Sequence, residues 1–203
     1  VVHVFISTSA SARLDAVARR LQARAPASEL VVVGASRGAA DDLVRQLSPR
    51  LGGTFGLTRV SFTELAARVA ATMLAERPRT PGTQTGAQAA ATRATFDALA
   101  ADELAYFAPV ARLPGFSQAL ARTLHEIRLA CVDIGGLTHA SPGAADLARL
   151  LARVDEQFGR SAVIDRPALF LTATRACSPG HAHSRWVGVP LVFLDVPLDS
   201  RAE

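Results

Sequence analysis

Short apolar runs alternate with helical patterns through residues 1–76. The runs cover residues 1–6, 30–33 and 57–62, and after each of them leucine and valine recur at helical spacing, the third such pattern covering residues 63–76. A run that is apolar throughout, as residues 30–33 are, is typical of a strand buried on both faces of a sheet. Parallel strands need crossover connections, which helices usually supply. The alternation therefore predicts an α/β fold in which helices cover a parallel sheet.

The alternation stops after residue 76 and resumes near the end of the chain. Residues 77–86 are rich in Pro, Gly and Thr, a composition typical of a boundary. The strand signal then vanishes as far as residue 176, and a second break at 178–184 precedes an apolar run at 189–195 that has the pattern of a buried strand. Helical patterns in between cover residues 89–107, 115–131, 144–157 and 166–176.

We therefore expect three segments. Residues 1–76 form the first part of an α/β lobe, residues 87–176 form an all-helical insertion, and residues 177–203 return to the lobe. A doubly wound sheet normally has further strands and a covering helix after a strand such as 189–195. We expect the 203 residues to be a fragment of a longer protein.

Every one of the 22 basic residues is an arginine. A chain without lysine has no P-loop lysine, no Schiff-base lysine and no Ser–Lys dyad, which excludes the enzyme classes that depend on them. The net charge of +4 is compatible with a polyanionic partner and is explained equally by a genome rich in Ala and Arg codons. No apolar run approaches the ~20 residues that span a bilayer. Two distant cysteines form no disulfide framework, so we expect a cytoplasmic protein without membrane contact.

The first predicted strand is followed by Ser7-Thr8-Ser9-Ala10-Ser11-Ala12-Arg13, where a parallel sheet would place a nucleotide phosphate. The segment offers hydroxyl groups but neither glycine nor lysine, so these side chains either cap the helix or hold an anion weakly. We interpret them as a degenerate nucleotide site without catalytic residues or cofactor. Its members are Ser7, Thr8, Ser9, Ser11 and Arg13, with Asp195 at the end of the last predicted strand. A lone carboxylate holds magnesium poorly. We therefore prefer to interpret Asp195 as a capping or structural acid rather than as a magnesium ligand.

Two later strand ends carry a recognisable pattern. They read Ala35-Ser36-Arg37-Gly38-Ala39-Ala40 and Ser61-Phe62-Thr63-Glu64-Leu65. These motifs resemble the two single-strand-contacting motifs in the first RecA-like lobe of UvrD/Rep-type helicases.

A third motif lies in the helical region. It begins at Pro114-Gly115-Phe116, continues through Leu120, Leu124 and Glu126-Ile127-Arg128, and ends at Leu137. It is similar to the helical insertion of AddB-type subunits of bacterial helicase–nucleases and of related PD-(D/E)XK-nuclease-family repair proteins. Leu194-Asp195 falls at the Walker B strand of that family, with Val196 where the second acid usually stands.

The resemblance implies a RecA-like lobe whose ATPase has decayed, within a protein that repairs double-strand breaks. It implies that this chain is non-catalytic and engages single-stranded DNA, that a nuclease domain lies farther along the full protein, and that a motor helicase–nuclease subunit is its partner. The alternative is a scaffold that holds the motor partner without touching DNA, with the helical insertion as its docking surface.

The predicted DNA contacts are Ser36, Arg37, Ser61, Phe62 and Thr63. Arg37 suits a phosphate or a base, and Phe62 is either a stacking face or a core residue. Ser36 is either a phosphate contact or an N-cap. Ser61 is either a DNA contact or, with Glu64, part of a capping box.

One loop near the end of the chain has metal-ligand chemistry. Cys177, His181 and His183 offer a thiol and two imidazoles without an evident fourth ligand, so a flexible loop without metal is the preferred interpretation over a zinc site. Trp186, beside Arg185, is expected to pack the insertion onto the lobe.

Overall fold

The computed structural model describes residues 2–24, 28–51, 55–139, 141–180 and 184–203. The chain divides into two compact units. The sheet unit comprises Val1–Ala71 and Arg175–Leu198, and the helical unit comprises Thr72–Thr174 and Asp199–Glu203. The α/β class predicted from the alternation is confirmed, because the sheet unit holds a parallel sheet. Among the described residues, no helix is long and apolar enough to cross a membrane.

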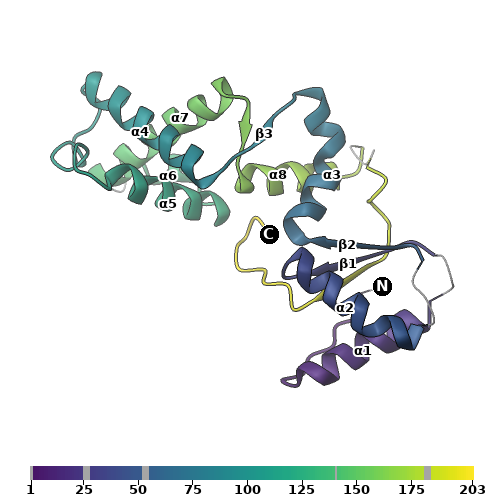
Figure 1. Cartoon of the computed structure of the whole chain (residues 1–203). Coiled ribbons are helices and arrows are strands. Elements are labelled where there is room, and N and C mark those ends of the chain that lie inside the picture. Colours follow the sequence, from purple (N-terminus) through teal and green to yellow (C-terminus); the bar gives the residue numbers. More distant parts are fainter. Residues whose placement is uncertain (1, 25–27, 52–54, 140, 181–183) are drawn as a thin grey trace. The chain divides into compact units, whose positions relative to one another are not determined.

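The sheet unit has three parallel strands in the order β2-β1-β5. In Figure 1, α1 and α2 lie on one side of this sheet and α3 lies on the other. Helix α3 continues into the helical unit. The elements are α1 (Ala10–Gln22), β1 (Leu30–Gly34), α2 (Arg37–Leu51), β2 (Leu57–Ser61), α3 (Phe62–Glu76) and β5 (Leu191–Leu194).

Strand β1 is the centre of the sheet unit. All five of its residues are buried, because β1 has a strand on each side and helices over its faces. Val32 packs into a cluster with Leu21 of α1 and with Leu43 and Leu47 of α2. The prediction of a strand buried on both faces at residues 30–33 is confirmed.

The strand predicted at residues 1–6 is wrong. Residues 2–6 lie outside the sheet, and Val2, Val4 and Ile6 are 88%, 77% and 89% exposed. An apolar, β-rich composition forms a strand only where a neighbouring strand offers hydrogen-bond partners, and none in the described part of the chain does so here. The segment beginning at Ser7 is therefore not a strand-to-helix turn, which removes the architectural basis of the predicted phosphate cradle.

Strand β5 also differs from its prediction. Residues 189–195 were expected to be buried, yet Leu191 and Phe193 are 43% and 44% exposed. The register joins β5 to β1, and Val192 and Leu194 pack against the cluster beneath the sheet. Because alternate side chains point to opposite faces, Leu191 and Phe193 face the other side, where cover is incomplete.

The helical unit departs from the predicted all-helical insertion in three places. Val163–Ile164 forms strand β4, which pairs in parallel with Thr80–Pro81 of β3. The helix predicted at 89–107 ends at Ala100, and the predicted Gly135-Gly136 break lies inside a short helix. The helices are α4 (Gln84–Ala100), α5 (Phe116–Leu129), α6 (Ile134–Leu137), α7 (Pro142–Arg160) and α8 (Arg166–Ala176), the last of which continues into the sheet unit.

Helix α7 holds the loop that follows α4 at two points. The fully buried Asp146 carboxylate accepts hydrogen bonds from the backbone N–H groups of Ala105, Tyr106 and Phe107 at 2.8–3.2 Å. Arg153 donates to both oxygens of Glu103, at 2.7 and 2.6 Å. These bonds lower the pKa of the Glu103 carboxyl. The loop therefore owes its conformation to charged side chains of α7.

Candidate nucleic-acid interface

The three strands of the sheet unit end side by side. Gly34, the last residue of β1, lies opposite Ser61 of β2 and Leu194 of β5. Because the strands are parallel, the segments that follow them leave the same edge of the sheet. Arg37, Phe62 and Asp195 thus follow neighbouring strand ends, although they are far apart in sequence.

Both predicted serine contacts act as helix caps. The Ser36 hydroxyl accepts a hydrogen bond from the Ala39 N–H at 3.1 Å. The Glu64 N–H donates to the Ser61 hydroxyl at 3.2 Å, and the Ser61 N–H donates to the Glu64 carboxylate at 2.8 Å, which together form a capping box. The capping alternative is therefore realised at both positions, while the N-termini of α2 and α3 remain at the sheet edge.

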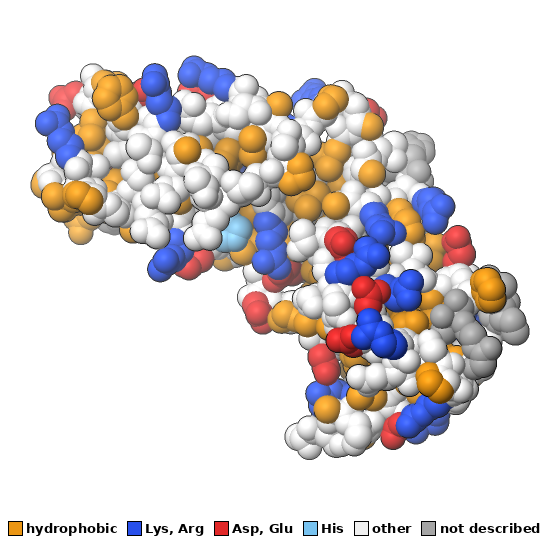
Figure 2. All heavy atoms as spheres, in the orientation of Figure 1, with side chains coloured by type: hydrophobic (Ala, Val, Ile, Leu, Met, Phe, Trp, Pro, Cys, Tyr) orange, Lys and Arg blue, Asp and Glu red, His pale blue; other side chains and the backbone are white. Residues whose placement is uncertain are grey.

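Arg37 is held loosely at the same edge. Its guanidinium lies 3.5 Å from Glu64 and 3.7 Å from Asp41, and its side chain is 52% exposed. Asp41 also pairs with Arg59 at 3.3 Å. Figure 2 shows the resulting mixture, in which blue and red side chains alternate over the sheet unit. Exposed ion pairs of this kind stabilise a fold by less than about 1 kcal/mol, so a phosphate can compete for Arg37.

Phe62 begins α3 and is partly buried. Its ring meets that of Phe193 of β5 edge to face, with centroids 5.9 Å apart. Thr63 lies next to it in the first turn of α3 and is also half-buried. Phe62 therefore packs on the sheet with part of its surface exposed, as the core interpretation predicts, and its role as a stacking face stays a prediction.

The residues of the predicted degenerate nucleotide site lie close together, and Thr8, Ser9 and Ser11 among them are exposed. Arg13 donates to both oxygens of Asp195, at 2.8 and 3.0 Å, and to the Ser7 carbonyl at 2.6 Å. The Ser9 hydroxyl caps α1 and lies 2.9 Å from that of Ser11. The Arg13 guanidinium thus binds the Asp195 carboxylate, the group that would bind magnesium in a Walker B strand.

Gly34 is required where β1 turns into α2. A Cβ at this position would lie 2.8 Å from the Ala40 nitrogen and 3.0 Å from the Ser36 carbonyl oxygen, both of them backbone atoms. We expect Gly34→Ala to lower the free energy of unfolding by about 1–3 kcal/mol in urea denaturation. Gly38→Ala is the matched control, because a Cβ added there has room and alanine favours helices. Equal losses of unfolding free energy for the two variants would contradict this account.

The predicted Cys177 loop lies partly outside the described residues, which include neither His181 nor His183. Cys177 is exposed and not in a disulfide. Among the described residues, no group of three metal-ligating side chains is close enough to hold an ion.

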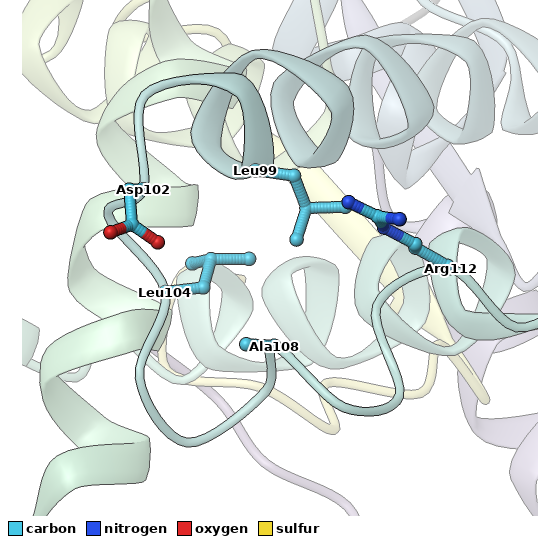
Figure 3. A pocket seen from close by; sticks show the side chains of 5 residues that line it. All are labelled: Leu99, Asp102, Leu104, Ala108 and Arg112. Carbon is cyan, nitrogen blue, oxygen red and sulfur yellow. The ribbon is translucent and has the colours of Figure 1, made fainter.

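A pocket of about 330 Å³ lies in the helical unit, where sequence reasoning placed no site. Figure 3 shows Asp102 and Arg112 on opposite sides of it, with Leu99, Leu104 and Ala108 between them. Asp102 has a φ of 54°, in the left-handed region, directly after α4. The pocket thus pairs one acidic and one basic side chain with aliphatic walls.

When the chain is compared with models of protein families and with curated proteins, no family model and no curated protein matches it. The resemblance to AddB-type subunits therefore depends on the motif residues alone.

Proposed function

We propose that the sheet unit contacts single-stranded DNA as a non-catalytic, degenerate helicase-like lobe of a bacterial helicase–nuclease that repairs double-strand breaks. The observation that carries the proposal is the register that aligns Gly34, Ser61 and Leu194. It gathers both motif loops, and the N-termini of the two helices they begin, at one edge of the sheet. Helix N-termini and arginine side chains are common phosphate ligands, and neither requires a particular base.

The pairing of Arg13 with Asp195 supports the non-catalytic part of the proposal. Magnesium in a phosphoryl-transfer site needs carboxylate oxygens together with phosphate. Here both oxygens of Asp195 already accept hydrogen bonds from a guanidinium, which neutralises their charge. We expect the purified chain to hydrolyse ATP no faster than a buffer blank, and hydrolysis above that rate would contradict the degenerate-site proposal.

The DNA contact is tested with a fluorescently labelled single-stranded oligonucleotide and the Arg37→Ala variant. We expect the variant to bind about tenfold more weakly, the cost of one lost charge-assisted hydrogen bond to phosphate. The slope of log affinity against log salt should also become shallower by about 0.7. Fluorescence anisotropy at several salt concentrations measures both.

Arg45→Ala is the matched control, since Arg45 is an exposed arginine of the same helix and pairs with Asp42. The proposed interface would be wrong if the affinity did not depend on salt concentration. It would also be wrong if Arg37→Ala and Arg45→Ala weakened binding equally.

A second candidate function is favoured by one observation. In the helical insertion, the docking surface expected for this alternative, Phe96, Tyr106 and Leu113 expose large apolar side chains (63%, 62% and 58%). A scaffold that holds a motor subunit would use such residues and leave the strand-end loops inert. Capture of the motor subunit that survives Arg37→Ala and Phe62→Ala, without any oligonucleotide binding, would favour this function.

A further inference from the structure

We infer that Arg68 and Arg185, held over the Trp186 ring, form a second phosphate contact for single-stranded DNA on the sheet unit. The inference rests on the proposed function, because its ligand is the same strand. The sequence predicted no role for Arg68, and it predicted only a packing role for Trp186.

The three side chains form one stack. The Arg68 guanidinium lies over the Trp186 indole, 5.0 Å from the ring centroid, and the Arg185 guanidinium lies over the same ring at 4.5 Å. The Ser184 hydroxyl donates to the Arg68 backbone carbonyl at 3.5 Å and accepts from the Trp186 backbone N–H at 3.4 Å. The segment that carries the indole is thus attached to α3 at the residue whose side chain covers the ring.

The stack carries positive charge that its surroundings compensate poorly. Arg185 pairs with Glu29 at 3.9 Å, and both side chains are more than 60% exposed. Within the described ranges of the chain, Arg68 forms no ion pair with a carboxylate. A cation–π contact attracts a guanidinium without neutralising it. A phosphate would supply the missing negative charge, and guanidinium groups bind phosphate through paired N–H donors.

The stack also continues the interface at the sheet edge. Arg37 contacts Glu64 of α3, and Arg68 follows Glu64 by four residues, so these side chains lie along one side of the helix. Four residues advance about 6 Å along a helix axis. A strand that crosses the sheet edge at Arg37 can therefore run along α3 to Trp186. Because both guanidinium groups lie over the indole, the stack meets the strand through its phosphates and leaves base recognition out.

Trp186 is the single tryptophan of the chain, so its fluorescence reports directly on this site. The probe is oligothymidylate titrated into the whole chain at low salt. We expect tryptophan emission to change saturably, with the same midpoint as strand binding measured by anisotropy.

The decisive variant is Arg68→Ala/Arg185→Ala. We expect affinity to fall about tenfold or more and the salt slope to become shallower by about 0.7 for each lost phosphate contact. The control is Arg19→Ala/Arg20→Ala, which removes two exposed charges from α1 and leaves the stack intact. Replacing Arg68 and Arg185 by lysine keeps the charge and should restore part of the affinity.

The outcomes separate this inference from the function on which it rests. The second contact is wrong if the strand binds without any change in tryptophan emission and the two double alanine variants weaken binding equally. That result would leave the proposed interface at Arg37 unaffected. If no strand binds even at low salt, both proposals fail. Coupled titration with a selective loss in the Arg68/Arg185 variant supports the second contact.

Discussion

Asp146→Ala should lower the free energy of unfolding of the helical unit by about 3–5 kcal/mol. Its carboxylate is fully buried and accepts hydrogen bonds from three consecutive backbone N–H groups and from Arg149. Removing it leaves three backbone N–H donors of a partly buried loop without their acceptor, and an unsatisfied donor costs about 1–3 kcal/mol. A typical domain is stable by only about 5–15 kcal/mol, so the loss is large. Urea denaturation followed by far-ultraviolet circular dichroism measures it.

Two further variants make this prediction specific. Asp146→Asn keeps the shape and one acceptor oxygen, but its amide N–H₂ group faces backbone N–H donors. Its loss of unfolding free energy should therefore lie between zero and that of Asp146→Ala. Asp155→Ala, on the same helix, is the control: this carboxyl is 51% exposed, and burial of its remaining surface raises its pKa, so its charge stabilises the fold little. Similar losses for Asp146→Ala and Asp155→Ala would show that the buried acceptor has no special role.

Leu150→Ala should cost the helical unit about 2–5 kcal/mol. Leu150 of α7 is completely buried in the cluster that also contains Ala91, Ala94 and Ala98 of α4. The small side chains of α4 let the two helices approach closely, so the space left by the missing methyl groups has little freedom to collapse. The midpoint of thermal or urea denaturation measures the loss.

Leu113→Ala is the control for this substitution, because Leu113 belongs to the same unit and its side chain is 58% exposed. It should change stability by no more than about 0.5 kcal/mol. A smaller effect at Leu150 than at Leu113 would be incompatible with the packing described for α4 and α7.

Several elements were predictable because the signals for them are local. The helix at residues 166–176 and the strand at residues 30–33 follow from side-chain periodicity and from short apolar runs. The strand predicted at residues 57–62 forms as well, but it ends at Ser61 and Phe62 begins α3. The capping box at Ser61 depends on residues three apart. The two motif loops were placed at strand ends for the same reason, so the main part of the proposed interface could be located without a structure.

Contacts between distant residues were not predictable in this way. The sequence grouped Arg13 and Asp195 in one site but did not predict that they pair with each other across 182 positions. The Asp146 carboxylate reaches a loop about 40 positions earlier. No local period marks such partners. The contact of Arg68 with Trp186 belongs to the same class, although the four-residue spacing of Glu64 and Arg68 indicates that the two share a helix side.

Most of the helices, and the loops that follow β1 and β2, could be placed from the sequence, because periodicity and capping act over a few neighbouring residues. That residues 2–6 lie outside the sheet and that β5 exposes one face depends instead on the assembled fold. A strand exists only beside another strand, and a face is buried only under another element. Whether that neighbour is present is a property of the whole fold.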